Sequence, residues 1–429
     1  MRPRFHHAPA ANWLSDPNGL VHWAGEWHLF YQYNPHGEDW GHMAWGHAVS
    51  RDLANWTELP PALVEDARFM IFSGSAVVDR ADSAGFGRDA LIALYTGAAR
   101  GEPGRQAQCL ASSSDQGRTW TKFPGNPVLD RGLADFRDPN VFWHAPTCRW
   151  IMTVVLSDRN TAVLYASDNL RDWTELSQIG PWDAPGEIWE CPLLIELPVE
   201  GSSERRWMFK VDVLRGAPGS GAIYRTGTFD GCHFEPDGDA WQVADWGSDF
   251  YAAIAWHEPR DAAGRPLWIG WLGNHAYQGQ LPDKGWRGAM SLPRRIALRR
   301  DAASYWLTQQ VEPAAVASAR PLPLHGPDCP GFGRFELPAG TGCRLVLTDG
   351  SGRELIVERQ GERVQLTRRD PTAPYLDAVQ STRLDRGIGL TGWLDGGSLE
   401  LVSGDGSVTL SVQHLLFSER LTIAFDQAD

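Results

Sequence analysis

Hydrophobic positions in the first 300 residues come in short runs that are separated by Gly, Asp and Pro. The clearest apolar or aromatic runs cover 26–33, 90–95, 150–155, 207–211 and 267–271. Short runs bounded by turn residues are typical of β-strands, and we find no stripe of about ten or more residues with the 3.6-residue period of an amphipathic helix. The pattern therefore predicts an all-β architecture for this part of the chain.

A repeated motif divides the same region into units of similar length. Ser-Arg-Asp-Leu-Ala-Asn-Trp at 50–56 returns in related form at 113–120 and 167–173, and more weakly at 228–234. The aromatic residues that end these copies lie 64, 53 and 61 residues apart. A period of about 60 residues suits a four-stranded sheet with its loops, and 300 residues hold about five such sheets. The repeat therefore predicts a five-bladed β-propeller.

We interpret the repeat itself as structural. Its acidic residues Asp52, Asp115 and Asp168 are expected to cap hairpin turns, and its Trp residues to pack between blades. Residues 321–429 show alternating strands with Gly turns and few acidic or aromatic motifs, which predicts a C-terminal β-sandwich with a supporting role. We therefore expect a propeller over 1–300, a linker over 301–320 and a sandwich over 321–429.

The composition narrows the classes of partner. The 429-residue chain has a formal net charge of −14, which disfavours nucleic acid and anionic membranes because phosphate groups attract a basic surface. No apolar run approaches the roughly 18 residues of a membrane span. The N-terminal residues lack the apolar region of a signal peptide, so we expect a cytoplasmic protein, or a secreted one whose leader was removed. The sequence leaves the oligomeric state open.

Cysteine and histidine patterns give no sign of a metal. The six Cys residues form no CxxC pair, and no Cys/His cluster has the spacing of a zinc site. His42 and His47 lie in an aromatic, strand-like segment without a third ligand, so we interpret them as structural hydrogen-bonding groups. We therefore expect neither a metal nor an organic cofactor.

Three acidic residues lie in short motifs of similar character. Asp16, Asp138 and Glu190 each have an aromatic neighbour and a Pro that follows closely. One such motif alone is more often a turn or an ion pair. Three together, in a chain with 21 Trp residues, favour a carbohydrate site, because paired carboxylates in apolar surroundings are the groups that cleave glycosidic bonds.

Taken together, these motifs resemble glycoside hydrolase family 32, the β-fructofuranosidase family of invertases, exo-inulinases and levanases. The resemblance rests on Asn-Trp-Leu-Ser-Asp-Pro-Asn-Gly at 12–19, Arg-Asp-Pro at 137–139 and Glu-Cys-Pro at 190–192, which occur in the family's order. Weaker matches lie at 31–35, 40–47, 72–76, 249–252 and 286–293. The resemblance implies a five-bladed β-propeller followed by a β-sandwich, in agreement with the repeat.

The resemblance also implies catalytic roles. Asp16 would be the nucleophile, Glu190 the general acid and base, and Asp138 a transition-state stabiliser that binds fructose hydroxyls. Such a double displacement retains configuration and requires about 5–5.5 Å between the two reacting carboxyl groups. We expect the apolar neighbours of Glu190, Ile188 and Trp189, to raise its pKa. Asp16 is expected to stay ionised through backbone N–H groups of the Pro-Asn-Gly turn that follows it.

Seven further residues are candidates for substrate binding by the same resemblance. Arg137 is expected to hold the carboxylate network and to keep Asp138 charged. Gln32, Trp40 and Ser73 match positions that shape the family's fructose pocket, although packing is an equal explanation for Trp40. The weaker candidates are Asn12, Asp249 and Trp286.

The sequence departs from the family pattern beside the nucleophile. Position 14 is Leu and position 15 is Ser, where the family's hydrolases commonly have Met and Asn. A shorter side chain at Ser15 is expected to weaken the orientation of Asp16 and the preference for water as acceptor.

The preferred hypothesis is a retaining exo-β-fructosidase that removes terminal β-D-fructofuranosyl residues from sucrose, fructo-oligosaccharides, inulin or levan. The alternatives are a fructosyltransferase, a non-catalytic fructan-binding propeller and, more distantly, an inverting propeller enzyme that acts on arabinose or xylose chains.

Overall fold

The computed structural model describes residues 2–101, 104–282, 284–302, 304–340, 342–416, 418 and 420–427. Within these ranges the secondary structure is strands, β1 to β32, and 3₁₀ turns of three or four residues. The predicted all-β class is therefore confirmed. No helix in the described part of the chain has the length and hydrophobicity to cross a membrane. The 3₁₀ turns are η1 (Ala145–Thr147), η2 (Ser157–Arg159), η3 (Gln278–Gln280), η4 (Pro313–Val316) and η5 (Pro374–Leu376).

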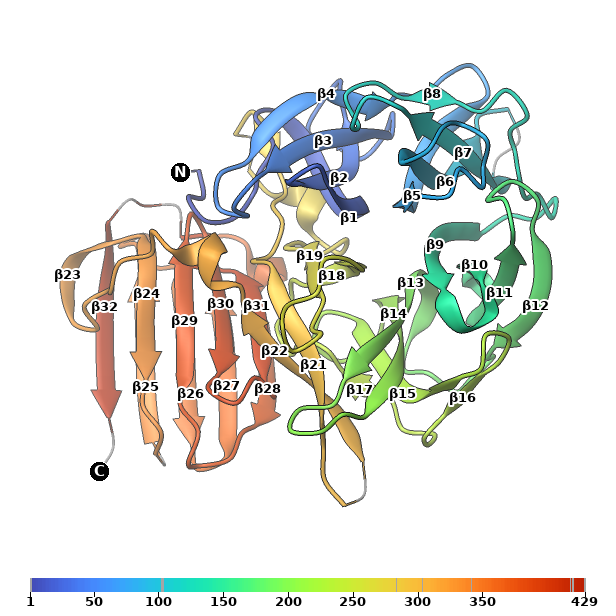
Figure 1. Cartoon of the computed structure of the whole chain (residues 1–429). Coiled ribbons are helices and arrows are strands. Elements are labelled where there is room, and N and C mark those ends of the chain that lie inside the picture. The colour runs from blue at the N-terminus through green and yellow to red at the C-terminus, as the bar shows by residue number, and fades with distance from the viewer. Residues whose placement is uncertain are drawn as a thin grey trace.

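The first 311 residues form five antiparallel sheets in chain order around a common centre (Figure 1). The first sheet contains β1 (Asn12–Trp23), β2 (Glu26–Asn34), β3 (Ala44–Ser50) and β4 (Thr57–Leu63). The second contains β5 (Phe69–Asp79), β6 (Ala90–Ala99), β7 (Gln106–Ser113) and β8 (Thr121–Lys122). The third contains β9 (Phe136–His144), β10 (Arg149–Leu156), β11 (Thr161–Ser167) and β12 (Thr174–Ile179).

The fourth and fifth sheets follow the same order. The fourth contains β13 (Glu187–Pro198), β14 (Arg205–Arg215), β15 (Ala222–Phe229), β16 (Phe234–Pro236) and β17 (Gln242–Val243). The fifth contains β18 (Tyr251–Trp256), β19 (Leu267–Trp271), β21 (Arg294–Arg300) and β22 (Tyr305–Val311). The short β20 (Trp286–Arg287) follows β19 in the chain but belongs to the first sheet, where it pairs in parallel with β1. The predicted linker over 301–320 therefore includes β22, and the fifth sheet continues to Val311.

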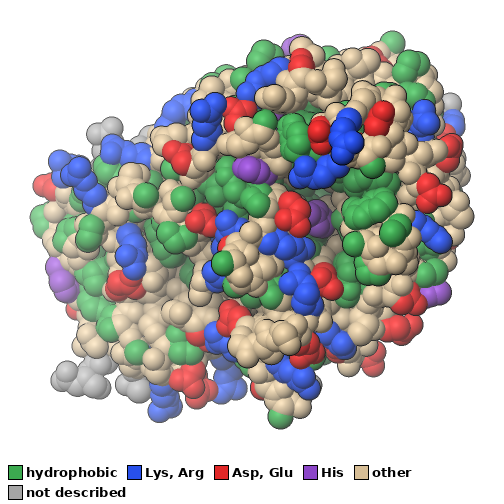
Figure 2. Space-filling view, viewed as in Figure 1, with side chains coloured by type: hydrophobic (Ala, Val, Ile, Leu, Met, Phe, Trp, Pro, Cys, Tyr) green, Lys and Arg blue, Asp and Glu red, His purple; other side chains and the backbone are tan. Residues whose placement is uncertain are grey.

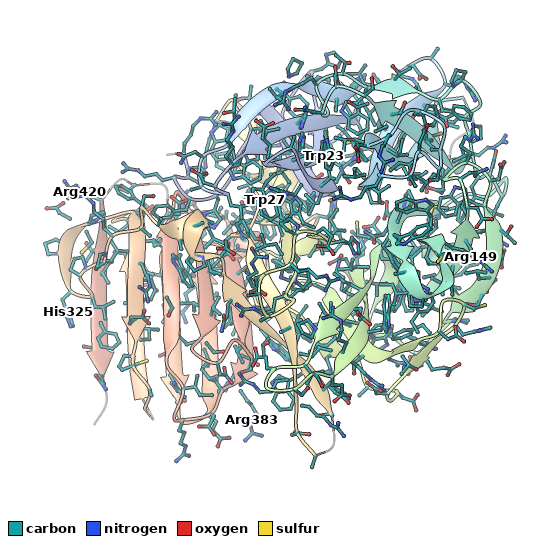
Figure 3. All side chains as sticks on the ribbon, in the orientation of Figure 1. Trp23, Trp27, Arg149, His325, Arg383 and Arg420 are labelled. Carbon is teal, nitrogen blue, oxygen red and sulfur yellow. The ribbon has the colours of Figure 1, made fainter. Side chains whose placement is uncertain are left out.

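The first strands of the five sheets contact one another in sequence: β1 contacts β5 and β18, β9 contacts β5 and β13, and β13 contacts β18. Aromatic side chains fill the wedges between sheets. Trp27, for example, lies between the first and fifth sheets (Figure 3) and meets Trp256 edge-on, with ring centroids 5.7 Å apart. The arrangement fits a β-propeller, and it brings five inner strands to one central region.

The repeated Ser/Asp/Trp motif connects the third and fourth strands of the sheets. In the first copy, Asp52 Oδ1 accepts a hydrogen bond from Asn55 N (2.8 Å), and Trp56 Nε1 donates to Leu53 O (3.1 Å). Trp120 and Trp173 repeat the indole contact to the backbone at 3.1 Å each. The prediction of a capped turn is therefore confirmed, except that the capping side chain of the third copy is Asn169 and not Asp168.

The C-terminal residues form two further antiparallel sheets that enclose one hydrophobic core. This pair of sheets fits a β-sandwich, as predicted. The six-stranded sheet has the order β23 (Gly326–Pro330), β32 (Arg420–Gln427), β25 (Gly342–Thr348), β26 (Glu354–Gln360), β27 (Arg363–Arg369) and β28 (Ala378–Arg383). The four-stranded sheet has the order β24 (Phe332–Leu337), β29 (Leu390–Asp395), β30 (Ser398–Ser403) and β31 (Thr409–Gln413).

A buried ionic cluster joins the sandwich to the five sheets. Arg294 on β21 donates to Asp245 Oδ2 (2.9 Å) and also pairs with Glu400 on β30; all three side chains are fully buried. His6 lies between Glu400 (2.8 Å) and Asp395 (2.9 Å). Burial disfavours the charged imidazole, but hydrogen bonds to these two carboxylates prevail and raise the pKa of His6 to about 9. Each domain therefore contributes buried charges whose partners lie in the other domain.

We expect Arg294→Met to destabilise the protein by about 3–5 kcal/mol, because the change leaves Asp245 and Glu400 buried without their cation. Arg334→Met is the matched control, since Arg334 and Glu336 form an ion pair in which both side chains are about half exposed and such pairs contribute less than about 1 kcal/mol. Urea denaturation followed by tryptophan fluorescence measures both. Equal losses in the two variants would contradict the prediction.

Candidate active site

Asp16, Asp138 and Glu190 come from three different inner strands, β1, β9 and β13, and the fold brings them together. Cys191 is the residue between them. Its backbone N–H donates to Asp138 Oδ2 (2.9 Å), and its sulfur lies 3.7 Å from Asp138 Oδ2 and 3.9 Å from Asp16 Oδ2. Acidic, basic and histidine side chains gather over the middle of the five sheets in Figure 2. The three motifs therefore form one site.

Asp16 lies at an irregular point of β1. The pairing register with β2 shifts between Leu14 and Pro17, so the segment predicted as a turn is part of a bulged strand. Ser73 Oγ on β5 donates to Asp16 Oδ2 (2.9 Å). The other oxygen, Oδ1, is buried and has no hydrogen-bond partner in the described structure. Asn18 does not reach Asp16; its side-chain oxygen instead accepts from Gly74 N (3.2 Å).

Asp138 has a left-handed backbone conformation, with φ of 65°. This conformation is uncommon for residues other than Gly, although Asp tolerates it better than most. The Asp138 N–H donates to Thr96 Oγ1 (2.9 Å) on β6, which holds the strained position from the neighbouring sheet. Backbone strain that neighbouring groups stabilise in this way is typical of functional sites.

Glu190 is held on both oxygens. Arg137 donates to its Oε1 through Nε (3.1 Å) and Nη2 (3.0 Å), and the Tyr251 hydroxyl donates to its Oε2 (2.6 Å). Arg137 also donates to Asp135 Oδ1 (2.7 Å) and Gln106 Oε1 (3.3 Å). The hydrogen bonds of Arg137 thus orient Glu190, while its charge acts on Asp138.

Burial and mutual repulsion set the ionisation of the three carboxyl groups. Burial, together with the charges of Glu190 and Asp16, raises the pKa of Asp138 to about 7, although Arg137 opposes the shift. Burial and Glu190 also raise the pKa of Asp16, against the effects of His275 and Ser73. In Glu190, burial favours a higher pKa, but Arg137, His275 and Tyr251 prevail and lower it.

Three expectations about these groups are therefore wrong. The pKa of Glu190 is lowered and not raised: its burial favours a higher pKa, but the charges of Arg137 and His275 and the hydrogen bond from Tyr251 outweigh burial. Arg137 does not keep Asp138 strongly acidic, because burial outweighs its charge. Asp16 takes its side-chain donor from Ser73 on the next sheet and not from the residues that follow it.

The predicted binding residues divide into two groups. Ser73 and Arg137 contact the carboxylates directly. Gln32 lies on β2 opposite the bulge that carries Asp16, and its buried Nε2 has no partner in the described structure. Trp40 lies in the loop after β2, is 51% exposed and meets Phe72 edge-on at 5.8 Å. Trp40 therefore reaches the carboxylates only through Phe72, the neighbour of Ser73.

Three other candidates lie outside the carboxylate group. Asn12 Nδ2 donates to Pro35 O (2.9 Å), and Trp286 pairs with Asn12 through the short strand β20, so both connect the end of the fifth sheet to β1. Asp249 is fully buried and pairs with Arg368 of the sandwich (3.4 Å). We therefore assign Asp249 to the domain interface, where a carboxylate needs a buried cation.

Sequence reasoning missed Tyr251 and His275. The motif at 249–252 indicated the correct segment, but Tyr251, two positions after Asp249, is the side chain that reaches Glu190. His275 lies after β19 and packs edge-on against Tyr251 and Trp271, with centroids 5.2 and 4.7 Å away. No spacing pattern in the sequence identifies a single His that joins a site through such packing.

The sequence that forms this site is similar to sequences of known proteins. Residues 6–310 match the sequence model for the N-terminal domain of glycosyl hydrolases family 32. A levanase from Bacillus subtilis is 46% identical over 308 residues, which cover 70% of this chain and 45% of the levanase. The matched region thus spans less than half of that relative.

Solved structures agree over nearly the whole chain. The exo-inulinase of Aspergillus awamori superposes with a TM-score of 0.85 at 31% identity, covering 98% of this chain and 95% of the inulinase. A β-fructofuranosidase of Schwanniomyces occidentalis, solved with fructosyl-erythritol, gives a TM-score of 0.86 at 28% identity and covers 99% and 94% of the two chains. Since the family model matches more than two thirds of the sequence and includes all three carboxylate motifs, the chain belongs to glycoside hydrolase family 32.

Proposed function

We propose that the protein is a retaining exo-β-fructosidase that hydrolyses terminal β-D-fructofuranosyl residues of sucrose, fructo-oligosaccharides, inulin or levan. The observation that carries the proposal is the state of Asp16: Ser73 fixes Oδ2, while Oδ1 is buried and has no hydrogen-bond partner in the described structure. A carboxylate oxygen that is oriented but not engaged suits nucleophilic attack. The names of the relatives, levanase, exo-inulinase and β-fructofuranosidase, support the substrate class.

The proposed reaction has two displacements. Ionised Asp16 attacks the anomeric carbon through Oδ1, the bond from that carbon to the bridging oxygen breaks, and the protonated form of Glu190 transfers its proton to the leaving oxygen. Glu190 then removes a proton from water, which attacks the same carbon and releases Asp16. Asp138 binds fructose hydroxyl groups beside the reacting carbon, and the N–H of Cys191 keeps its carboxyl group in place.

The fold supports attack on a chain end. We propose that the five sheets are the blades of a five-bladed propeller that extends to Val311, and that β20 completes the first blade. The carboxylates of inner strands β1, β9 and β13 come together around Cys191, so a terminal sugar enters along the propeller axis. The sandwich supports this propeller through the ionic cluster around Arg294.

Transfer of fructose to a sugar is the second candidate function, and Ser15 favours it. The Ser15 hydroxyl is buried and accepts a hydrogen bond from Trp13 Nε1 (3.1 Å). In the described structure Ser15 makes no hydrogen bond to Asp16, so this position does not help to orient the nucleophile. A site with one fewer polar contact near the reacting carbon discriminates less between water and a sugar acceptor.

Product analysis on concentrated sucrose tests the proposal. Equal release of glucose and fructose is expected from a hydrolase, and inulin and levan then define the preferred linkage. Glucose in clear excess over fructose identifies transfer, and Ser15→Asn is then expected to restore the balance. NMR of the first fructose anomer released distinguishes retention from inversion. No release from sucrose, inulin or levan contradicts the enzyme proposal and favours a fructan-binding propeller.

We expect Glu190→Gln to lower kcat on sucrose by about 10²–10⁴-fold, because general acid catalysis contributes a factor of that size. The loss is expected to be smallest with an aryl fructoside, whose leaving group needs little protonation.

Asp16→Asn removes the nucleophile and is expected to abolish turnover on both substrates. Steady-state kinetics measure these effects, with Glu336→Gln, a half-exposed residue of the sandwich, as control. Full activity of Asp16→Asn would rule out the proposed nucleophile.

The Tyr251 hydrogen bond gives a pH prediction with a defined sign. It stabilises ionised Glu190 and so lowers the pKa of that group. Tyr251→Phe therefore raises the pKa of Glu190, and the proton needed for general acid catalysis persists to higher pH. The alkaline limb of the kcat/KM profile is expected to move up by about one pH unit. Tyr375→Phe, which alters an exposed side chain, serves as control; a shift to lower pH contradicts the assignment.

A further inference from the structure

A cluster of potential metal ligands lies on the loop that carries Trp40. His36 and His42 belong to this loop between β2 and β3, and Glu65 belongs to the connection between β4 and β5. His42 Nδ1 lies 2.7 Å from Glu65 Oε1, and the His36 ring lies edge-on to His42, with centroids 5.2 Å apart. One ligand atom of each residue lies within 4.8 Å of those of the other two. The sequence hides the cluster, because Glu65 is distant from both His residues along the chain.

The spacing suits a first-row divalent metal. Two imidazoles and one carboxylate are ligands that zinc accepts, with water at the remaining position. Ligand atoms about 2.1 Å from a tetrahedral metal lie roughly 3.4 Å from one another. The farthest pair of atoms therefore has to approach by at most about 1.4 Å, a movement that rotation of exposed imidazoles provides. The two His side chains are exposed, and that of Glu65 is only 16% exposed.

The backbone around these ligands is already fixed. Asn34 Oδ1 accepts from His36 N (2.9 Å), and Asn34 Nδ2 donates to Asp39 O (2.7 Å). At the other end of the loop, Ile71 N donates to Met43 O (2.9 Å). Arg100 pairs with Glu65 Oε2, which leaves Oε1 directed at His42. Partners that orient a ligand in this way raise the affinity of metal sites.

We propose that His36, His42 and Glu65 bind a divalent transition metal, and that the bound ion restrains the loop that presents Trp40. The site replaces the interpretation of His42 as a purely structural group, because the fold supplies the two ligands that the local sequence lacks. His47, by contrast, is buried and lies 3.0 Å from His28 between ring nitrogens. It takes no part in the site.

The metal is expected to affect substrate binding more than chemistry, a consequence that rests on the proposed fructosidase activity. Trp40 lies between the two His residues in the chain and packs against Phe72, the neighbour of Ser73. Ser73 in turn donates to Asp16. A restrained loop therefore alters the approach to the pocket and changes KM for sucrose, while kcat stays the same.

Calorimetric titration of the full chain with ZnCl₂ tests the site directly. We expect one binding event that weakens at least tenfold in His36→Ala and in Glu65→Gln, two changes in connections between strands that leave the sheets intact. His325→Ala removes another exposed His, in the sandwich (Figure 3), and is expected to leave binding unchanged. Equal zinc affinity in all three variants, or no binding by the unaltered protein, overturns the proposal.

Kinetics with saturating Zn²⁺ or with EDTA test the link to the loop. The expected result is at least a twofold difference in KM at constant kcat, which disappears in Trp40→Ala although zinc still binds. A zinc effect on KM that persists in Trp40→Ala overturns the proposed route. The titration reads metal binding without any fructoside, so it separates failure of the metal site from failure of the proposed activity.

Discussion

Electrostatic repulsion among Asp16, Asp138 and Glu190 is the constraint on which the rest of the structure depends. Three carboxyl groups in a largely buried space lose hydration and oppose one another's ionisation. Arg137 offsets part of this cost by donating twice to Glu190. The part that is not offset raises the pKa of Asp138 to about 7. The scaffold therefore holds carboxyl groups whose full ionisation is unfavourable, and a bound sugar can favour it by supplying hydroxyl donors.

The scaffold meets this demand through buried polar groups behind the site. Lys210 is fully buried, pairs with Asp212 and donates to Cys191 O (3.3 Å) and Ala253 O (2.8 Å). It thereby supports the irregular point of β13 at Cys191, whose φ of 47° is as unusual as that of Asp138. Farther out, Arg294 couples the fifth sheet to the sandwich. The sheets thus hold strained backbone at the centre, and ion pairs between the two domains stabilise the sheets. In a less rigid fold the carboxyl groups would move apart.

Much of this organisation could be predicted from sequence, because strands, capped turns and the order of motifs are local properties. Asp16, Asp138 and Glu190 were found because each lies in a short, unusual segment. The hydrogen bonds and pKa values of these carboxyl groups could not be predicted, since they depend on partners from other sheets. Trp189 adjoins Glu190 in sequence yet points into the core, while Tyr251, 61 residues away, sets its hydrogen bonding. The motif around Asp249 indicated a functional segment, but its two polar side chains have different partners. Asp249 pairs with Arg368 of the sandwich, and Tyr251 donates to Glu190.

The pairing of β20 with β1 has a consequence for synthesis of the protein. Asn12 lies opposite Trp286, so β1 leaves the ribosome about 270 residues before its parallel partner, an interval on the order of tens of seconds. Until then the strand that carries Asp16 has an open edge, which is the kind of surface that invites pairing with other chains. The start of β1, at Asn12 and Trp13, is thus among the first parts of the protein to be made and among the last to be paired.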